Sequence, residues 1–151
     1  MGVARPVVRT GPGSLRVSVD LIPPPPRAWL LLTEATHIAV WWSADVKLMP
    51  VLDGRLRDLH RSGDTFALTV GRVTRCEAPS ILEMTWAEDT WPGATRLVFH
   101  LGTRSSGTSL ILMHDGWDAL PAAARMRLIE SYALSWSEKL ALLAAYAADA
   151  A

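Results

Sequence analysis

Cysteine is nearly absent from this sequence, because Cys76 is the only one among 151 residues. A single cysteine excludes an intramolecular disulfide and a zinc site built from cysteines. The four histidines are scattered, and no two have the i, i+4 spacing that places metal ligands on one helix face. The sequence also lacks a Gly-x-Gly-x-x-Gly or P-loop pattern that would hold nucleotide phosphates. We therefore predict neither a metal nor a cofactor.

Net charge is also lacking, since 15 basic residues balance 15 acidic ones. The arginines form no basic run, which argues against a nucleic-acid partner. The longest apolar run covers 140–148, whereas a membrane-spanning helix needs about 20 residues. Residues 1–14 contain no apolar stretch of signal-peptide length. We expect no nucleic-acid partner and no membrane partner, and the cytoplasm is the default location.

Tryptophan is abundant: the sequence has seven, beside two tyrosines and two phenylalanines. An indole buries about 150–250 Å² and carries one N–H that needs a partner. Seven indoles exceed what a small core needs for filling alone. We expect some of them to line a cavity or an interface.

We predict a flexible arm over residues 1–14 followed by one domain over residues 15–151. Alternating apolar and polar residues predict strands joined by short polar turns, which is typical of an antiparallel sheet. Two short helices are predicted over 27–34 and 35–42. The predicted strands cover 15–21, 46–52, 56–60, 65–77, 81–87, 95–101 and 108–114.

The C-terminal part changes its period. Residues 122–148 contain neither glycine nor proline, and apolar residues recur there at steps of three and four. This spacing predicts one amphipathic helix of about 40 Å. A sheet covered by a single long helix has to curve around it, and such a geometry tends to leave a pocket between the two.

Several motifs in a fixed order resemble one known family. Gly-Thr-x-Leu begins at Gly107, and a strand ending in Trp86 follows a break at Pro79. The other matching segments are Trp29-Leu30-Leu31-Leu32-Thr33, Trp41-Trp42, Asp53-Gly54, Gly71-x-Val73, Glu77, Leu82, His114-x-Gly116 and Trp136-x3-Leu140-x2-Leu143. Because it contains these segments in this order, the chain resembles the START-like (SRPBCC) superfamily, in the subfamily similar to the activator of Hsp90 ATPase homologue 1.

The resemblance covers 15–148 and implies an α+β helix-grip fold. In that fold a curved antiparallel sheet wraps around a long C-terminal helix, with two short helices after the first strand and a hydrophobic cavity inside. Three positions depart from the family pattern: Arg55 in the turn, Ala78 before Pro79, and Ser135 before Trp136. A serine in place of glycine at 135 adds a side chain near the contact between helix and sheet, which narrows the cavity.

The predicted ligand-binding residues come from the sheet, from the facing side of the long helix and, for Trp42, from the end of the second short helix. They are Trp42, Leu68, Met84, Trp86, Phe99, Leu112, His114, Tyr132 and Trp136. His114 is the leading polar candidate, although a strand-end histidine bonded to backbone explains it as well. Asp58 and His60 share one side of a strand and can interact, and a solvated hairpin edge is the other interpretation.

The leading hypothesis is that the protein binds a small hydrophobic molecule, with or without turnover. A second hypothesis is an enzyme similar to polyketide cyclases and aromatases, with His114 and Tyr132 as its polar groups, or a natural-product self-resistance protein. We assign no catalytic residues, because no nucleophile-elbow pattern is present. A third hypothesis is an Hsp90-type co-chaperone interaction module with a chaperone partner.

A homodimer is a further hypothesis. It would form through Trp91 or through the outer sheet face, where Ile111 and Met113 are apolar.

Overall fold

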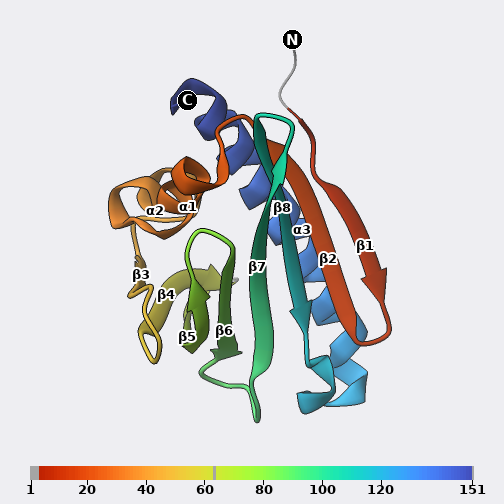
Figure 1. Ribbon diagram of the computed structural model, residues 1–151. Helices are drawn as coiled ribbons and strands as arrows, with labels where there is room; N and C mark the ends of the chain where they lie inside the picture. The colour runs from red at the N-terminus through yellow and green to blue at the C-terminus, as the bar shows by residue number, and fades with distance from the viewer. Residues whose placement is uncertain (1–3, 63, 151) are drawn as a thin grey trace.

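The computed structural model describes residues 4–62 and 64–150. Within these residues an eight-stranded antiparallel sheet curves around one long helix (Figure 1). The strands are β1 (Val7–Gly11), β2 (Ser14–Leu21), β3 (Val46–Leu48), β4 (Arg55–Ser62), β5 (Thr65–Glu77), β6 (Ile81–Glu88), β7 (Thr95–Arg104) and β8 (Gly107–Asp115). The helices are α1 (Pro25–Thr33), α2 (Ala35–Trp41), a single 3-10 turn (Trp117–Ala119) and α3 (Ala122–Ala150).

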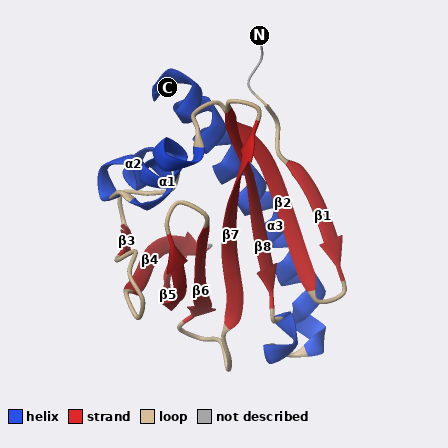
Figure 2. Cartoon of the chain, in the orientation of Figure 1, coloured by secondary structure: helices blue, strands red, loops and turns tan. Residues whose placement is uncertain are grey.

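The strand order is β1-β2-β8-β7-β6-β5-β4-β3. Strands β3 to β8 follow one another as a meander. β2 pairs with β8, and β1 pairs with β2 at the edge of the sheet. Figure 2 shows α3 crossing behind β8 and β2, while α1 and α2 lie together near the β3 side. This arrangement confirms the predicted α+β helix-grip fold with two short helices early in the chain, although they follow the second strand, β2, and not the first.

Two segments differ from the sequence prediction. Residues 7–11 lie in the predicted flexible arm, but they form β1 and pair with β2. Four of these five residues are exposed, so no alternation of buried and exposed side chains marks the strand. The strand predicted over 46–52 ends at Leu48 instead, and Pro50, which has no N–H to donate to a ladder, follows shortly after.

The core lies between the concave face of the sheet and α3. Alternate residues of β7 and β8 point into it and are almost completely buried, as the sequence pattern predicts. From α3, the buried stripe consists of Ile129, Ala133, Trp136, Leu140, Leu143, Ala144 and Ala147. The backbone of α3 lies closest to β2 and β1, and the space near β4, toward the opposite side of the sheet, is less completely filled.

Gly71 is required where β5 approaches β6. A Cβ atom at this position would lie 2.0 Å from the carbonyl oxygen of Thr85, which no side chain tolerates. The neighbouring backbone N–H of Arg72 donates to Thr85 Oγ1 over 2.9 Å and holds the strands at this spacing. The sheet therefore accepts only glycine at position 71.

We expect Gly71→Ala to lower the free energy of unfolding by about 1–3 kcal/mol, the usual cost of forcing extra volume into a packed site. Gly102→Ala is the matched control, because a Cβ at Gly102 in β7 meets nothing within 4 Å. Urea denaturation of both variants measures the difference. Equal losses in the two variants would contradict the steric argument.

Candidate functional site

A cavity of about 260 Å³ lies between β4, the end of α2 and α3. Its walls come from four elements of the sheet and helices that are distant in sequence. The residues that line it are Trp42, Ser43, Asp58, His60, Arg61, Trp86, Tyr132, Ser135, Trp136 and Lys139. One part of the lining is aromatic and the other part is polar, so the cavity suits an amphipathic molecule.

The aromatic wall is a cluster of three indoles. The ring centroids of Trp42 and Trp136 are 5.3 Å apart, and those of Trp86 and Trp136 are also 5.3 Å apart. Trp42 and Trp86 lie nearly parallel at 6.1 Å. The indoles touch one another, so the space directly beneath α3 is filled and the cavity lies beside this cluster.

Adjacent tryptophans have different roles at the end of α2. Trp41 is 1 % exposed and its Nε1 donates to the backbone oxygen of Leu31 over 2.8 Å. Trp42 follows as the C-terminal cap residue and points to the cavity. Successive helical residues point about 100° apart, which explains why one ring enters the core and the other the cavity.

The polar side of the cavity comes mainly from β4. Asp58 and His60 alternate with Arg57 and Leu59, which are exposed on the opposite face. His60 Nε2 lies 3.1 Å from the hydroxyl of Thr69 on β5. Asp58 is directly opposite Thr69 and is only 5 % exposed. A carboxylate with so little contact with water needs hydrogen bonds to offset its lost hydration.

Two buried polar atoms at this cavity lack a hydrogen-bond partner. Within the described residues, Asp58 Oδ1 and Trp42 Nε1 are the buried side-chain atoms in this condition. Burial raises the pKa of the Asp58 carboxyl, while the charges of His60 and Lys139 and the Trp42 indole act in the opposite direction. The indole N–H of Trp42 therefore lies beside the carboxyl and favours its ionised form as a hydrogen-bond donor does, and both atoms are closed off from the cavity.

Lys139 faces this carboxyl from α3. Its Nζ donates to Ser135 Oγ over 2.6 Å and lies 5.7 Å from the ring centroid of Trp136. Burial lowers the pKa of Lys139, and the charge of Asp58 partly opposes that shift. No ion pair within 4.0 Å joins the two groups in the described part of the chain. They therefore bound the cavity from separate walls.

Tyr132 forms the end of the cavity toward β6. Its hydroxyl donates to Glu88 Oε2 over 2.7 Å and accepts from Trp86 Nε1 over 3.2 Å. Burial raises the pKa of the Tyr132 phenol, and the nearby Glu88 adds to the shift. The phenol stays protonated, and its proton and one acceptor position of its oxygen are engaged, so these bonds hold Tyr132 in place as a wall of the cavity.

His114 belongs to a different environment. It is completely buried, and Trp136 Nε1 donates to its Nδ1 over 3.2 Å. Its Nε2 lies 2.7 Å from Thr95 Oγ1, whose own proton goes to the backbone oxygen of Trp86. This chain assigns the proton of the imidazole to Nε2. Burial lowers the pKa of His114 to about 3, so the ring is neutral and both of its nitrogens are engaged.

The structure brings four of the nine residues proposed for ligand binding to this cavity: Trp42, Trp86, Tyr132 and Trp136. A second group is completely buried in the core and consists of Met84, Phe99, Leu112 and His114. Leu68 lies on the outer face of β5, because it shares its side with the exposed Phe66 and Val70 and alternates with the buried Thr69. The apolar alternation at 66–70 therefore marks the solvent side of this strand.

Asp58, His60 and Lys139 line the cavity, although none of them was among the predicted ligand-binding residues. One signal was present for the first two, because Leu56 is apolar between Arg55 and Arg57 and so marks the inner side of the strand. Asp58 and His60 share that side. Lys139 is one helical turn beyond Trp136, which places both on neighbouring parts of one helix face.

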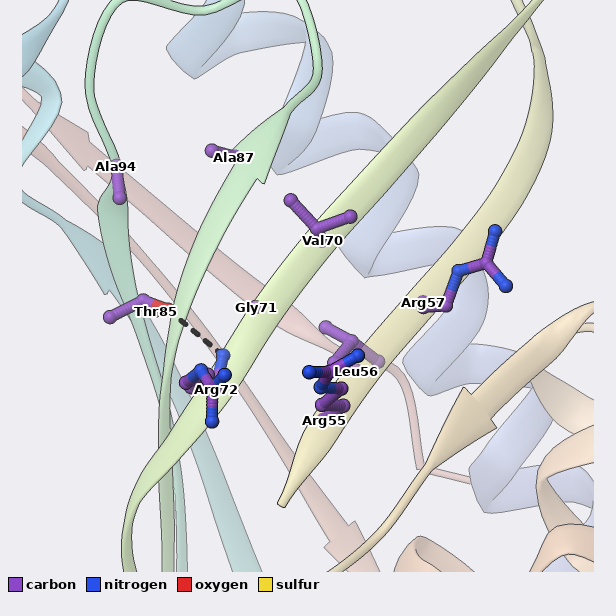
Figure 3. Close-up of a pocket in the computed structure, with 9 residues that line it drawn as sticks. All are labelled: Arg55, Leu56, Arg57, Val70, Gly71, Arg72, Thr85, Ala87 and Ala94. Atoms are coloured by element: carbon purple, nitrogen blue, oxygen red, sulfur yellow. Dashed lines mark hydrogen bonds between the residues drawn. The ribbon is translucent and has the colours of Figure 1, made fainter. Parts of the chain in front are cut away.

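Two larger hollows lie elsewhere, with volumes of about 480 and 490 Å³. The first is on the outer face of β4, β5 and β6, where Arg55, Arg57 and Arg72 line one side and Ala87 and Ala94 the other (Figure 3). Its arginines are exposed, and in the described residues none of them has a carboxylate within 4.0 Å. Neither hollow contains a buried polar atom without a partner, so the inner cavity is the stronger candidate site.

The described residues contain no cluster of three or more histidine, cysteine, aspartate or glutamate side chains able to hold a metal ion. No helix among them is long and apolar enough to cross a membrane.

The structure is a curved sheet wrapped around one long helix, with a small cavity beside β4 near one edge of the sheet. The sequence model of the family described as "Activator of Hsp90 ATPase homolog 1-like protein" matches residues 23–148. The chain belongs to this family, which confirms the resemblance found in its motifs. Comparison with curated protein sequences found no match.

Solved structures with the same fold are similar over most of the chain. A protein from Rhodobacter sphaeroides has 20 % identity and a TM-score of 0.79, with 95 % of this chain and 98 % of that chain covered. The Aha1 dimer from Colwellia psychrerythraea has 17 % identity and a TM-score of 0.69, covering 87 % and 92 %. DynU16, described as a putative protein in the dynemicin biosynthetic locus, has 18 % identity and a TM-score of 0.70, covering 89 % and 46 %. At these identities the similarity shows the fold.

Proposed function

We propose that this protein binds a small, mostly apolar molecule in the cavity between β4, α2 and α3. The observation that carries the proposal is a cavity of about 260 Å³ lined by three indoles and by the titratable side chains of Asp58, His60 and Lys139. A molecule with an apolar body and a polar end meets both kinds of wall, and its binding removes apolar surface from water.

Tryptophan fluorescence tests the proposal, because three indoles line the cavity. We expect titration with a panel of flat apolar molecules to produce a saturable change in emission for at least one of them. No change across a broad panel would refute the proposal.

A steric variant ties the signal to the cavity. Ser135 lines it, so we expect Ser135→Leu to fill part of the space and to abolish the fluorescence change. Ser131→Leu is the matched control, since Ser131 lies one turn earlier on α3 and is exposed. Equal binding to both variants would place the ligand outside this cavity.

Two alternatives stay as hypotheses. A natural-product role, as cyclase or self-resistance protein, is suggested by the fold shared with DynU16 and by three titratable side chains at the cavity, Asp58, His60 and Lys139. A chaperone partner is suggested by the family name alone. Binding of a small molecule is the proposal that the cavity itself supports.

A homodimer has one supporting comparison, the dimeric Aha1 from Colwellia psychrerythraea. Trp91 is half-buried against Trp117 and Tyr132, at centroid distances of 5.7 and 5.8 Å. On the outer sheet face, the other predicted surface, Met113 is 37 % exposed.

A further inference from the structure

We propose that the outer face of β3, β4 and β5 binds an acidic segment of a partner protein. Four exposed basic side chains meet on this face, and we term them the basic patch: Lys47, Arg55, Arg57 and Arg72. The strand registers bring them together, because Lys47 lies directly opposite Arg57 and Arg55 lies directly opposite Arg72. The patch is on the side of the sheet opposite the cavity, so the inference goes beyond the proposed function.

The positive charges of the basic patch face one another without compensation. Like charges at directly opposite positions of neighbouring strands destabilise a sheet. In the described part of the chain, none of the four side chains has a carboxylate within 4.0 Å. Asp53 is the acidic residue among those that line the two larger hollows, and its backbone oxygen accepts from Arg72 over 3.3 Å. The fold therefore retains positive charge here that no neighbouring carboxylate neutralises.

Arg96 shows how the same face of the sheet neutralises an arginine elsewhere. It lies between Glu83 and Asp115, at N–O distances of 3.4 and 2.7 Å. Protection of a sheet edge explains Lys47, since charges on edge strands discourage pairing with another sheet. It does not explain the arginines of β4 and β5, because these strands are paired on both sides. A complementary negative surface on a partner accounts for them.

The shape of this face favours an elongated partner. Arg55 and Arg57 line both of the larger hollows, which therefore adjoin one another. The registers align Lys47, Arg57, Val70 and Ala87 as one row across β3, β4, β5 and β6, and Figure 3 shows the last three on neighbouring strands. Strands are about 4.8 Å apart, so the row is about 14 Å long and an extended segment of about five residues crosses it.

The chemistry of the row favours a polypeptide with carboxylates at one end and apolar side chains at the other. Guanidinium groups bind carboxylates through paired hydrogen bonds. Val70, which is 40 % exposed, and Ala87 add apolar surface beyond the charges. The residues that line the two hollows include no aromatic side chain on which the bases of a single-stranded nucleic acid would stack. An acidic peptide segment is therefore favoured over a nucleic acid.

Fluorescence polarisation with a labelled peptide tests the inference on the full chain. The first half of the peptide is rich in glutamate and the second half is rich in leucine, and a control peptide has glutamine in place of glutamate. We expect the Kd of the glutamate peptide to be at least about tenfold lower, because exposed ion pairs contribute little singly but several act together here. Its affinity should fall as NaCl is added, since salt screens exposed charges.

A double variant locates the binding on the basic patch. Arg55→Gln with Arg57→Gln removes the two side chains shared by both hollows and is expected to raise the Kd of the glutamate peptide at least about tenfold. Arg9→Gln with Arg16→Gln is the matched control, because Arg9 and Arg16 form an exposed cross-strand pair that lines neither hollow. Urea denaturation should show the first variant to be at least as stable as the unmodified protein, since it loses repulsion between like charges.

The outcomes separate this inference from the proposed function. Absence of binding by the glutamate peptide, equal affinities for the two peptides, or equal Kd values in the two double variants would overturn the inference. Tighter binding of single-stranded DNA or of phosphatidylglycerol vesicles, lost when Arg55 and Arg57 are replaced, would assign the patch to another anionic partner and would also overturn it. Each of these results leaves the proposed function standing, because the cavity residues Asp58 and His60 lie on the other side of β4.

Discussion

Replacing Trp136 by alanine is expected to lower the free energy of unfolding by about 3–5 kcal/mol, the range for deleting a large buried aromatic side chain. Trp136 is 1 % exposed and its ring contacts Trp42, Trp86 and Phe99 at centroid distances of 5.3, 5.3 and 6.0 Å. The substitution removes this packing and also the N–H that donates to His114. Urea denaturation monitored by far-UV circular dichroism measures the loss.

Trp91→Ala is the control for Trp136→Ala. Trp91 is only half-buried, at the edge of the aromatic cluster, so its removal leaves a smaller cavity and is expected to cost less. Trp136→Phe should fall between the two because it keeps a ring but loses the donor. A loss below about 1.5 kcal/mol for Trp136→Ala would mean that the cluster is loosely packed and collapses easily.

Acidification is expected to destabilise the protein through His114. Burial lowers the pKa of this residue from 6.5 to about 3 in the folded state, so the unfolded chain takes up a proton first as the pH falls. The stability contributed by the neutral histidine is complete above pH 6.5 and is lost progressively between pH 6.5 and about 3. The slope reaches at most about 1.4 kcal/mol per pH unit, and the total is on the order of 4–5 kcal/mol.

The hydrogen bonds of His114 explain why its protonation destabilises the folded protein. Nδ1 accepts from Trp136, so protonation would turn two donors toward each other in a completely buried site. Asp115 contributes in the same direction, because its bond to Arg96 lowers its pKa, whereas burial of Asp58 raises its pKa and opposes the trend.

His114→Gln isolates the contribution of the histidine, since it keeps hydrogen-bonding groups but does not titrate. We expect free energies of unfolding measured at pH 7, 6 and 5 to fall less steeply for the variant than for the unmodified protein. Parallel profiles would show that His114 is not the group responsible.

The fold was predictable because its signals are periodic. Alternation in β7 and β8 and the three- and four-residue steps of α3 are large repeated patterns, and each was found at nearly its observed bounds. β1 was not found, because its residues are exposed on both faces and alternation is invisible there. Short strands at the edge of a sheet depend on pairing with a neighbour more than on their own pattern.

The cavity was less predictable than the fold. The alternation of side chains along its strand predicted that His114 lies at the pocket. Alternation identifies the face of the sheet that a residue occupies, but it does not identify which part of the long helix covers that residue. Trp86, Trp117 and Trp136 fill the space around His114, and the cavity lies toward β4 instead. The burial of Asp58 depends on how β4, α2 and α3 pack together, which is a property of the assembled structure.

The shortness of β3 has a consequence for the cavity. In the part of the chain that the structure describes, β3 pairs with Leu56, Arg57 and Asp58 of β4 and stops there. His60 and Arg61 line the cavity beyond this point and have a ladder on the β5 side only. The entrance can therefore shift without breaking a second set of backbone bonds, while the floor at Asp58 is held from both sides. Such a site would be selective for the buried end of a molecule and tolerant of substituents at its outer end.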